Sequence, residues 1–242
     1  MALKRRVVVK GRIIVSIALL FSFIVFAVSF KKGCIVKNKE NIPFGEIMLP
    51  KPRYDSEKSI EHVLQNRRSN REFAGKSITL AQFSQLLWAA QGVTNDQGFR
   101  TAPSAGALYP MELYVVVGSV KGLDSGVYKY NCRKHAITLV RSGDALNELE
   151  VACLGQSCIG ESAIAIVIMG VYARVRCKYG ERAIRYVHIE AGHVSQNVCL
   201  QAVALGLATV TVGAFDDGRV QGVVRAKSDE EPLYVMPVGW TV

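Results

Sequence analysis

Five consecutive residues, Arg67-Arg68-Ser69-Asn70-Arg71, place three guanidinium groups and a hydroxyl group side by side. A guanidinium group binds phosphate through a planar fork, and one phosphate monoester can accept two or three such partners. A basic run of this kind can equally be a solvated surface. The segment therefore predicts a phosphate site only together with further signals.

A second segment, Gly98-Phe99-Arg100-Thr101-Ala102-Pro103-Ser104-Ala105-Gly106-Ala107-Leu108-Tyr109-Pro110, is rich in small residues. It follows a predicted helix and precedes a predicted strand. Small residues let the backbone approach a flat ring closely, and loops of this length in compact domains are usually functional. The alternative is a loop that only connects the helix to the strand and has no function of its own.

A third segment, Tyr179–Asn197, carries small and polar side chains within about two helical turns: Glu190, Gly192, His193, Gln196 and Asn197. Glu190 and His193 form one E-x-x-H, but a di-iron site needs a second copy. His188, Glu190 and His193 do not have the H-E-x-x-H spacing of zinc hydrolases. We therefore predict no metal site. A lone buried histidine is usually a satisfied core residue, which is the alternative to a functional role for His193.

A fourth segment, Val212-Gly213-Ala214-Phe215-Asp216-Asp217, passes from a predicted strand into a predicted helix. The N–H groups exposed there suit an anion or the electron-rich edge of a reduced ring, although an ordinary turn would look the same. The chain has no G-x-S-x-G, Walker A or G-x-G-x-x-G motif, which argues against the usual hydrolase, P-loop and Rossmann functions.

Hydrophobic periodicity and capping signals define the elements that must position these segments. Helices are predicted at 59–66, 79–92, 145–154, 182–207 and 216–224, and strands at 112–118, 126–130, 136–140, 163–171, 208–212 and 233–239. Thr79 and Gln82 form a capping box. The continuous apolar run 163–171 is typical of a strand in the middle of a sheet. This mixture predicts an α+β body, a three-layer sandwich with a mixed central sheet.

The charge of the chain is concentrated at its N-terminus. The net charge is +10, but residues 1–40 hold nine Lys or Arg residues and a single Glu, which leaves +2 for residues 41–242. Such a body lacks the basic patch that nucleic acids require. Ile13–Phe30 is apolar apart from three serines and is about as long as a bilayer core.

We accordingly predict an N-terminal signal or transmembrane anchor at 1–32, a proline-containing linker at 33–56 and a folded domain at 57–242. A secretory signal peptide that is removed by cleavage remains an alternative to the anchor. Lys4-Arg5-Arg6 is also compatible with a degenerate twin-arginine signal. The domain is expected to be membrane-anchored or exported. Six cysteines without a CxxC pair indicate neither a zinc site nor a disulfide scaffold, and Cys199 is expected to be a buried free thiol.

Several motifs, taken in order, closely resemble the nitroreductase superfamily, and within it the branch of SagB-type and azoline-oxidising dehydrogenases. They are RRSNREF (67–73), ITLAQFSQLLWAAQG (78–92), FRTAPSAGALYPMELYVV (99–116), YGERAIRYVHIEAGHVSQN (179–197), VGAFDD (212–217) and EPLYVMPVG (231–239). The resemblance covers nearly all of residues 57–239. It implies an FMN-binding domain that forms an intertwined homodimer with flavins at the subunit interface.

The resemblance also assigns roles to individual residues. The predicted cofactor-binding residues are Arg67, Arg68, Ser69, Arg71, Pro103, Ser104, Ala105, Gly106, Gly192, Gln196, Gly213, Ala214 and Gly239. The first four would bind the phosphate and ribityl chain, and the Pro103–Gly106 loop would reach the flavin of the partner subunit. Candidates for proton transfer are Lys178, Tyr179, Tyr186 and His193. By the same resemblance, Trp240 stands where many relatives have a basic residue, and the match does not include the additional N-terminal domain of azoline-oxidising relatives.

Two hypotheses follow. The first is an FMN-dependent oxidoreductase that transfers hydride between flavin and a small organic or peptide-derived substrate, with NAD(P)H as a possible electron donor. The second is a membrane-tethered flavin-binding or maturation protein without turnover. A di-iron or zinc enzyme would become a third hypothesis only if the purified protein contained stoichiometric metal.

Overall fold

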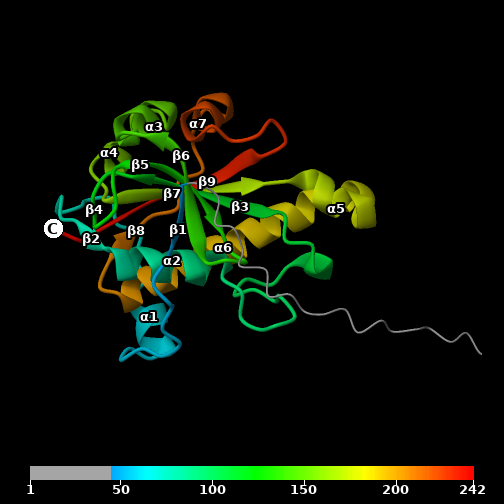
Figure 1. Cartoon of the computed structure of the whole chain (residues 1–242), viewed down its shortest axis with the longest axis horizontal. Coiled ribbons are helices and arrows are strands. Elements are labelled where there is room, and N and C mark those ends of the chain that lie inside the picture. Colours follow the sequence, from blue (N-terminus) through cyan, green and yellow to red (C-terminus); the bar gives the residue numbers. More distant parts are fainter. Residues whose placement is uncertain (1–44) are drawn as a thin grey trace, which may run out of the picture. The chain divides into compact units, whose positions relative to one another are not determined.

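A computed structural model of the chain describes residues 45–242 (Figure 1). Its centre is a seven-stranded sheet in the order β1-β6-β5-β3-β7-β9-β8. The strands are β1 (Glu46–Met48), β3 (Met111–Val117), β5 (Gly126–Asn131), β6 (Ala136–Ser142), β7 (Ile164–Gly170), β8 (Ala208–Thr209) and β9 (Glu231–Gly239). Two further short strands, β2 (Ile78–Thr79) and β4 (Val120–Lys121), pair with each other outside this sheet.

The predicted mixture of parallel and antiparallel strands in the central sheet is not found in the described part of the chain. All neighbouring strands of the seven-stranded sheet run antiparallel, whereas a mixed sheet was expected. Among residues 45–242, parallel pairing occurs only between β2 and β4 and at the isolated bridge from Ser69 to Thr209. Strand direction depends on how distant segments meet, and no local pattern encodes it.

The predicted position of the 163–171 strand is confirmed. β7 lies between β3 and β9, and all seven of its residues are buried. Side chains alternate between two cores on opposite faces of the sheet. Leu113 and Val115 belong to one core, whereas Tyr114 and Val116 belong to the other.

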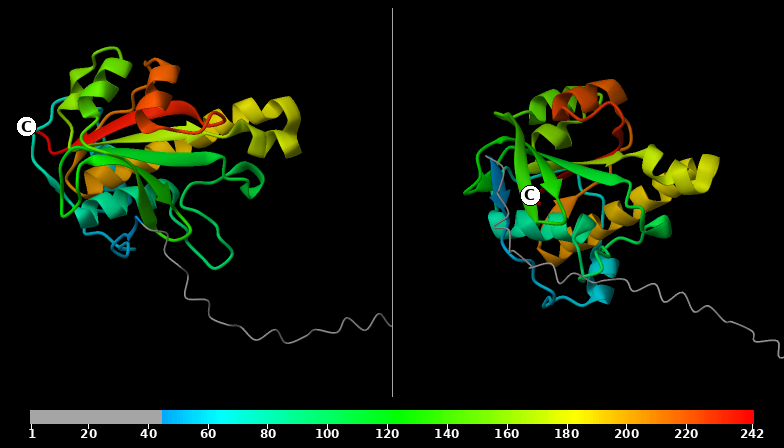
Figure 2. Two further views of the ribbon diagram at one scale, coloured as in Figure 1. Left: turned by 45° about the horizontal axis from the view of Figure 1, so that its top comes forward. Right: turned by 45° about the vertical axis from the view of Figure 1, so that its right-hand side comes forward.

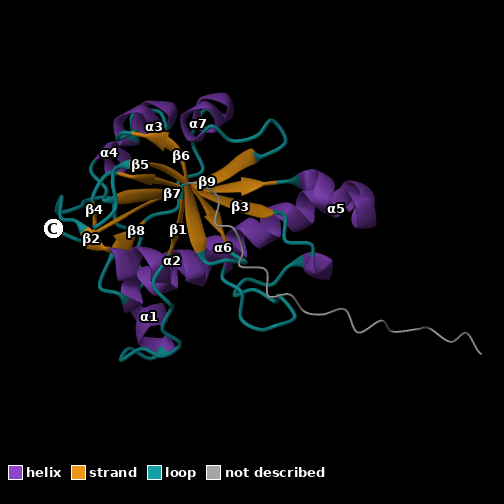
Figure 3. Ribbon diagram, viewed as in Figure 1, coloured by secondary structure: helices purple, strands orange, loops and turns teal. Residues whose placement is uncertain are grey.

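Helices cover both faces of the sheet and complete the three layers (Figures 1 and 3). One face carries α2 (Leu80–Gln91) and α6 (Ala183–Ala204), with α1 (Ile60–Asn66) next to α6. The other carries α3 (Leu146–Ala152), α4 (Ser157–Gly160) and α7 (Asp217–Val224). α5 (Tyr172–Tyr179) projects beyond the end of the sheet in each view (Figure 2).

Capping side chains mark the starts of α1 and α2 at the expected residues. The Ser59 side chain accepts a hydrogen bond from the His62 N–H at 3.2 Å, and Thr79 forms the predicted capping box with Gln82. α2 ends at Gln91 before Gly92. The predicted strand at 208–212 is shorter than expected, because only Ala208–Thr209 forms a strand and Val212 makes an isolated bridge.

The folded body begins earlier than the predicted boundary at residue 57. β1 lies within the stretch assigned to a linker, yet it pairs with β6, and the neighbouring Leu49 is only 7% exposed. The predicted anchor at 1–32 lies outside the described residues. Within residues 45–242, no helix is both long enough and apolar enough to span a bilayer.

Candidate functional site

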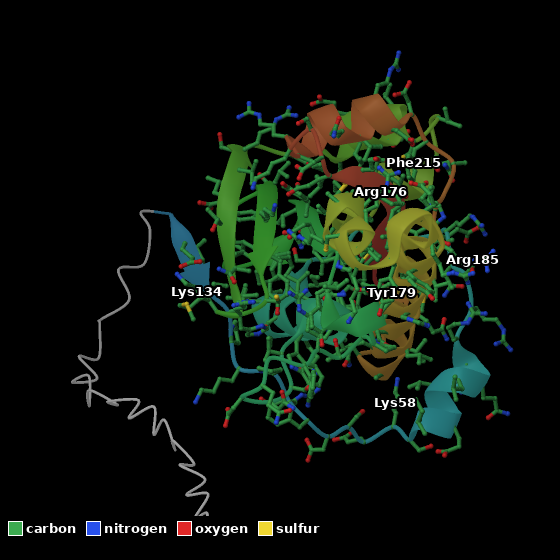
Figure 4. All side chains as sticks on the ribbon, turned by 90° about the vertical axis from the view of Figure 1, so that its right-hand side faces the viewer. Lys58, Lys134, Arg176, Tyr179, Arg185 and Phe215 are labelled. Atoms are coloured by element: carbon green, nitrogen blue, oxygen red, sulfur yellow. The ribbon has the colours of Figure 1, made fainter. Side chains whose placement is uncertain are left out.

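The Pro103–Gly106 loop packs against the C-terminal end of α5. A Cβ atom on Gly106 would lie 2.8 Å from the Tyr179 hydroxyl oxygen and 2.9 Å from Lys178 Nζ. The Tyr179 ring also meets the Tyr186 ring edge-on, with the centroids 5.0 Å apart. Three of the four predicted proton-transfer candidates are therefore assembled beside the predicted flavin-facing loop. Figure 4 faces the end of the molecule that carries α5 and labels Tyr179 there.

The residues after Gly106 adopt an unusual backbone. Ala107 has φ of 55° and Tyr109 has φ of 48°, a left-handed conformation that costs non-glycine residues energy and often marks functional sites. The surroundings hold this conformation in place. The Tyr109 N–H donates to Ser104 Oγ at 2.9 Å, and Arg174 Nη1 donates to the Tyr109 carbonyl at 3.0 Å.

A buried carboxyl group, Glu190, lies next to this loop. Glu190 is 2% exposed, and its Oε1 has no hydrogen-bond partner among residues 45–242. Burial raises its pKa to about 7, opposed by the Ser104 hydroxyl and the charge of Arg100. Arg100 in turn donates from Nη1 to Gln91 Oε1 at 2.7 Å. Glu190 was not among the predicted site residues.

The spacing in α6 could have identified Glu190 as buried. It lies three residues after Val187 and four before Val194, both fully buried members of the apolar stripe, so it borders that stripe. His193 is exposed rather than buried in the core. Gly192 and Gln196 are exposed as well, and a Cβ on Gly192 would meet nothing within 4 Å.

The arginine segment is fixed along β8. The Asn70 N–H donates to the Thr209 carbonyl at 3.1 Å, and Ser69 forms a parallel bridge with Thr209. Within residues 45–242, neither Arg67 nor Arg71 takes part in an ion pair. A cavity of about 440 Å³ is lined by Ser69, Asn70, Arg71, Glu72, Thr241 and Val242. Exposed hydroxyl and guanidinium groups at a cavity fit a phosphate group.

Arg68 differs from the other two arginines. Its Nη1 donates to the carbonyls of Gln65 and Arg67 at 2.9 and 2.8 Å. Such bonds satisfy carbonyls at the end of α1 that have no partner within the helix. Part of its guanidinium group therefore has a structural role at the end of α1.

The Gly213–Ala214 turn follows the bridge between Val212 and Val235. Both residues are exposed, and their N–H groups have no backbone acceptor among residues 45–242. Gln156 Nε2 donates to the Ala214 carbonyl at 2.9 Å, which fixes the turn. Two consecutive free amides fit an electron-rich ring edge or an anion.

Two C-terminal residues have packing roles. A Cβ on Gly239 would lie 3.0 Å from the Phe73 ring, so the glycine makes room for the segment that follows Arg71. Trp240 Nε1 donates to the Ser77 carbonyl at 3.2 Å, and the Trp240 carbonyl accepts from the Ala74 N–H at 2.9 Å. Trp240 thus ties the chain end to residues 74–77.

The two halves of the predicted site lie apart along α6. The loop half lies near Glu190, where Ser104 and Arg100 act on the pKa of its carboxyl group. The phosphate half lies near Cys199, a buried free thiol whose pKa is raised by burial and lowered by the charge of Arg67. Nine residues of helix separate Glu190 from Cys199, or about 13 Å. Residues 45–242 contain no cluster of three His, Cys, Asp or Glu residues that could hold a metal ion.

Comparisons with known proteins agree on one family. Residues 64–240 match the model of the nitroreductase family. A Methanocaldococcus jannaschii protein named as a nitroreductase is 46% identical over 195 residues, which cover 80% of this chain and 96% of the relative. A Rhizobium leguminosarum bv. trifolii protein named as trifolitoxin-processing is 34% identical over 113 residues, which cover 45% of this chain and 30% of that protein.

A solved structure gives the same result. A crystal structure from Anabaena variabilis, named as a nitroreductase, superposes with a TM-score of 0.74 at 30% identity. The superposition covers 84% of this chain and 43% of the Anabaena chain. The chain therefore spans less than half the length of that protein.

Proposed function

Because the chain belongs to the nitroreductase family, a family of flavin-dependent oxidoreductases, we propose that it is an FMN-dependent oxidoreductase. It transfers hydride between flavin and a small organic or peptide-derived substrate. The observation that carries this proposal is the packing of Gly106 against Lys178 and Tyr179, because it puts groups that hold protons at the loop predicted to face the flavin.

The residues at the other half of the site fit FMN. Arg67 and Arg71 have no ion-pair partners among residues 45–242 and can bind the phosphate, together with the Ser69 hydroxyl. The N–H groups of Gly213 and Ala214 can donate to the ring. Bound FMN would supply the two-electron chemistry. The chain would supply position, exclusion of water, and proton transfer by Lys178 or Tyr179.

The separation of the two halves along α6 supports a homodimer. A second protomer that faces α6 could bring its Pro103–Gly106 loop to the phosphate half of the first. The exposed side of α6 includes Ile184, which is 40% exposed, and Ile189, which is 48% exposed, beside the exposed Gly192 and His193. Both side chains line one hollow on the exposed side of α6, and contiguous exposed apolar side chains are typical of subunit contacts.

The finer assignment is to the SagB-type branch. The relative named as trifolitoxin-processing supports a substrate derived from a peptide, and the exposure of Lys178 at the loop leaves room for one. The protein would be anchored in a membrane or exported through its N-terminal segment, and the apolar run Ile13–Phe30 supports this location. NAD(P)H would be the donor only if the domain faces the cytoplasm.

Visible absorbance of the purified full chain tests the proposal. We expect the flavin spectrum as purified or after addition of FMN, and bleaching when a donor and then a substrate are supplied in the absence of oxygen. Protein that stays colourless after incubation with FMN would overturn the proposal. Bound flavin that no donor or substrate changes would favour the alternative of a flavin-binding protein without turnover.

A further inference from the structure

A cavity of about 660 Å³ lies beside the loop that carries Gly106. Its wall includes residues 107–109, which follow Gly106 directly, and Arg174, which precedes Lys178 on α5. Four residues of helix span one turn, or about 6 Å. The cavity is therefore adjacent to the cluster formed by Gly106, Lys178 and Tyr179.

The charges around this cavity do not cancel. Its lining contains four cationic side chains and one carboxylate: Arg100, Lys129, Arg133, Arg174 and Glu112. Glu112 is already neutralised, because one oxygen lies 3.2 Å from Lys129 Nζ and the other pairs with Arg174. Lys129 is also 2.6 Å from Glu230. Within residues 45–242, Arg100 and Arg133 therefore have no ion-pair partner.

The Arg100 guanidinium is held in a fixed position. Its central carbon lies 4.4 Å from the centroid of the Tyr109 ring, and Nη1 donates to Gln91 Oε1 at 2.7 Å. A cation held in this way loses little side-chain entropy when it binds an anion. The charge of Arg100 acts on groups in the cavity wall. It lowers the pKa values of Tyr130 and Cys132, whereas burial raises them.

Arg133 lies in the turn between β5 and β6. Asn131 Oδ1 accepts hydrogen bonds from the N–H groups of Arg133 and Lys134 at 3.2 and 3.3 Å, which fix the turn. The Arg133 side chain is exposed at the cavity. Burial raises the pKa values of Tyr130 and Cys132, so neither supplies a competing anion at neutral pH.

We propose that this cavity binds an anionic group, a carboxylate or a phosphate, of a molecule that reacts at the flavin site. Arg133 and the remaining donors of Arg100 bind the anion, and the rest of the molecule extends past residues 107–109 toward Lys178. This role in turnover rests on the proposed function, but binding of the anion does not require turnover. A carboxylate would come from the substrate and a phosphate from the electron donor.

Calorimetric titration of the full chain saturated with FMN, so that the proposed phosphate site at Arg67 and Arg71 is filled, tests the proposal with benzoate, inorganic phosphate and benzamide at low, constant ionic strength. We expect at least one of the two anions to bind and neutral benzamide not to bind. Arg133→Gln should weaken binding of that anion about tenfold through loss of a charged donor, and Arg133→Lys should restore part of it. Lys121→Gln, which removes an exposed charge outside the cavity lining, should have no effect.

Tighter binding of benzoate would assign the cavity to a substrate carboxylate, and tighter binding of phosphate would assign it to the donor. The proposal is wrong if neither anion binds more tightly than benzamide, or if Arg133→Gln binds the anion as well as the original chain does. Failure of the same preparation to bind FMN would instead count against the proposed function. The two failures are therefore distinguishable.

Discussion

Gly106 and Tyr179 are in such close contact that a single methyl group at Gly106 would lie 2.8 Å from the Tyr179 hydroxyl oxygen. The contact joins the predicted flavin-facing loop to the end of α5. Gly106 also has φ of 63°, which glycine adopts without steric cost. Both the backbone and the available space therefore favour glycine.

Gly106→Ala should lower flavin-dependent activity at least about tenfold, because the methyl group must displace Tyr179 or Lys178, and displaced catalytic groups lose rate steeply. Gly122→Ala is the matched control, since Gly122 has φ of 81° but nothing within 4 Å of its Cβ position. Both variants should lose about 1 kcal/mol of stability from the positive φ. Equal activity in the two variants would show that the contact with Tyr179 is unimportant.

Replacement of both Arg67 and Arg71 by Ala should weaken FMN binding on the order of 100-fold, because two charged donors to the phosphate are lost. The melting temperature of the apoprotein should change little, since neither arginine forms an ion pair within residues 45–242. Arg68→Ala is the comparison. Arg68 Nη1 donates hydrogen bonds to carbonyls at the end of α1. Arg68→Ala should therefore lower the melting temperature more than the double replacement does, and release less FMN. Flavin fluorescence and thermal melts of each variant measure both effects.

Elements with strong local signals could be predicted from the sequence. α2 begins and ends where the Thr79–Gln82 capping box and Gly92 indicate, and β7 lies inside the sheet as its apolar run predicts. α5 was missed because only Val175 of its eight residues is buried, so there is no apolar stripe to detect. β1 was missed because its three residues form a strand only by pairing with β6, about ninety residues later in the chain.

Most residues of the candidate site could be predicted from the sequence, but the contacts between them could not. The loop containing Gly106 and the residues Lys178 and Tyr179 were both singled out, but their contact depends on the position of α5, which no local pattern gave. Gly239 was assigned to the cofactor, and the structure adds a packing role, because its Cβ position faces Phe73. That packing arises between segments more than 160 residues apart, and sequence spacing cannot reveal it.

The exposed face of α6 leads to a prediction about subunit assembly. Ile189→Glu should convert a dimer to a monomer and cause loss of FMN, because it places a charge in the proposed interface. Val151→Glu is the control: Val151 is 61% exposed on α3, in the opposite layer of the fold. Sedimentation and flavin content should change only for Ile189→Glu. A monomeric chain that binds FMN fully would contradict the two-subunit site.

Glu190 should make the stability of the domain depend on pH. Burial raises its pKa from 4.5 to about 7 in the folded state, so between these values the folded chain binds more protons than the unfolded chain. The free energy of unfolding then falls as pH rises through this range, by at most about 3 kcal/mol, and stays low above it. Glu190→Gln mimics the protonated form and should remove this fall.

Urea denaturation at pH 5 and pH 8 measures the effect for the original chain, Glu190→Gln and Glu181→Gln. Glu181 is exposed just before α6, so its replacement should leave the pH dependence as it was. At pH 8 we expect Glu190→Gln to be more stable than the original chain, because it no longer buries an ionised carboxylate whose Oε1 has no partner within residues 45–242. An unchanged loss of stability between pH 5 and pH 8 in Glu190→Gln would assign the titration to another group.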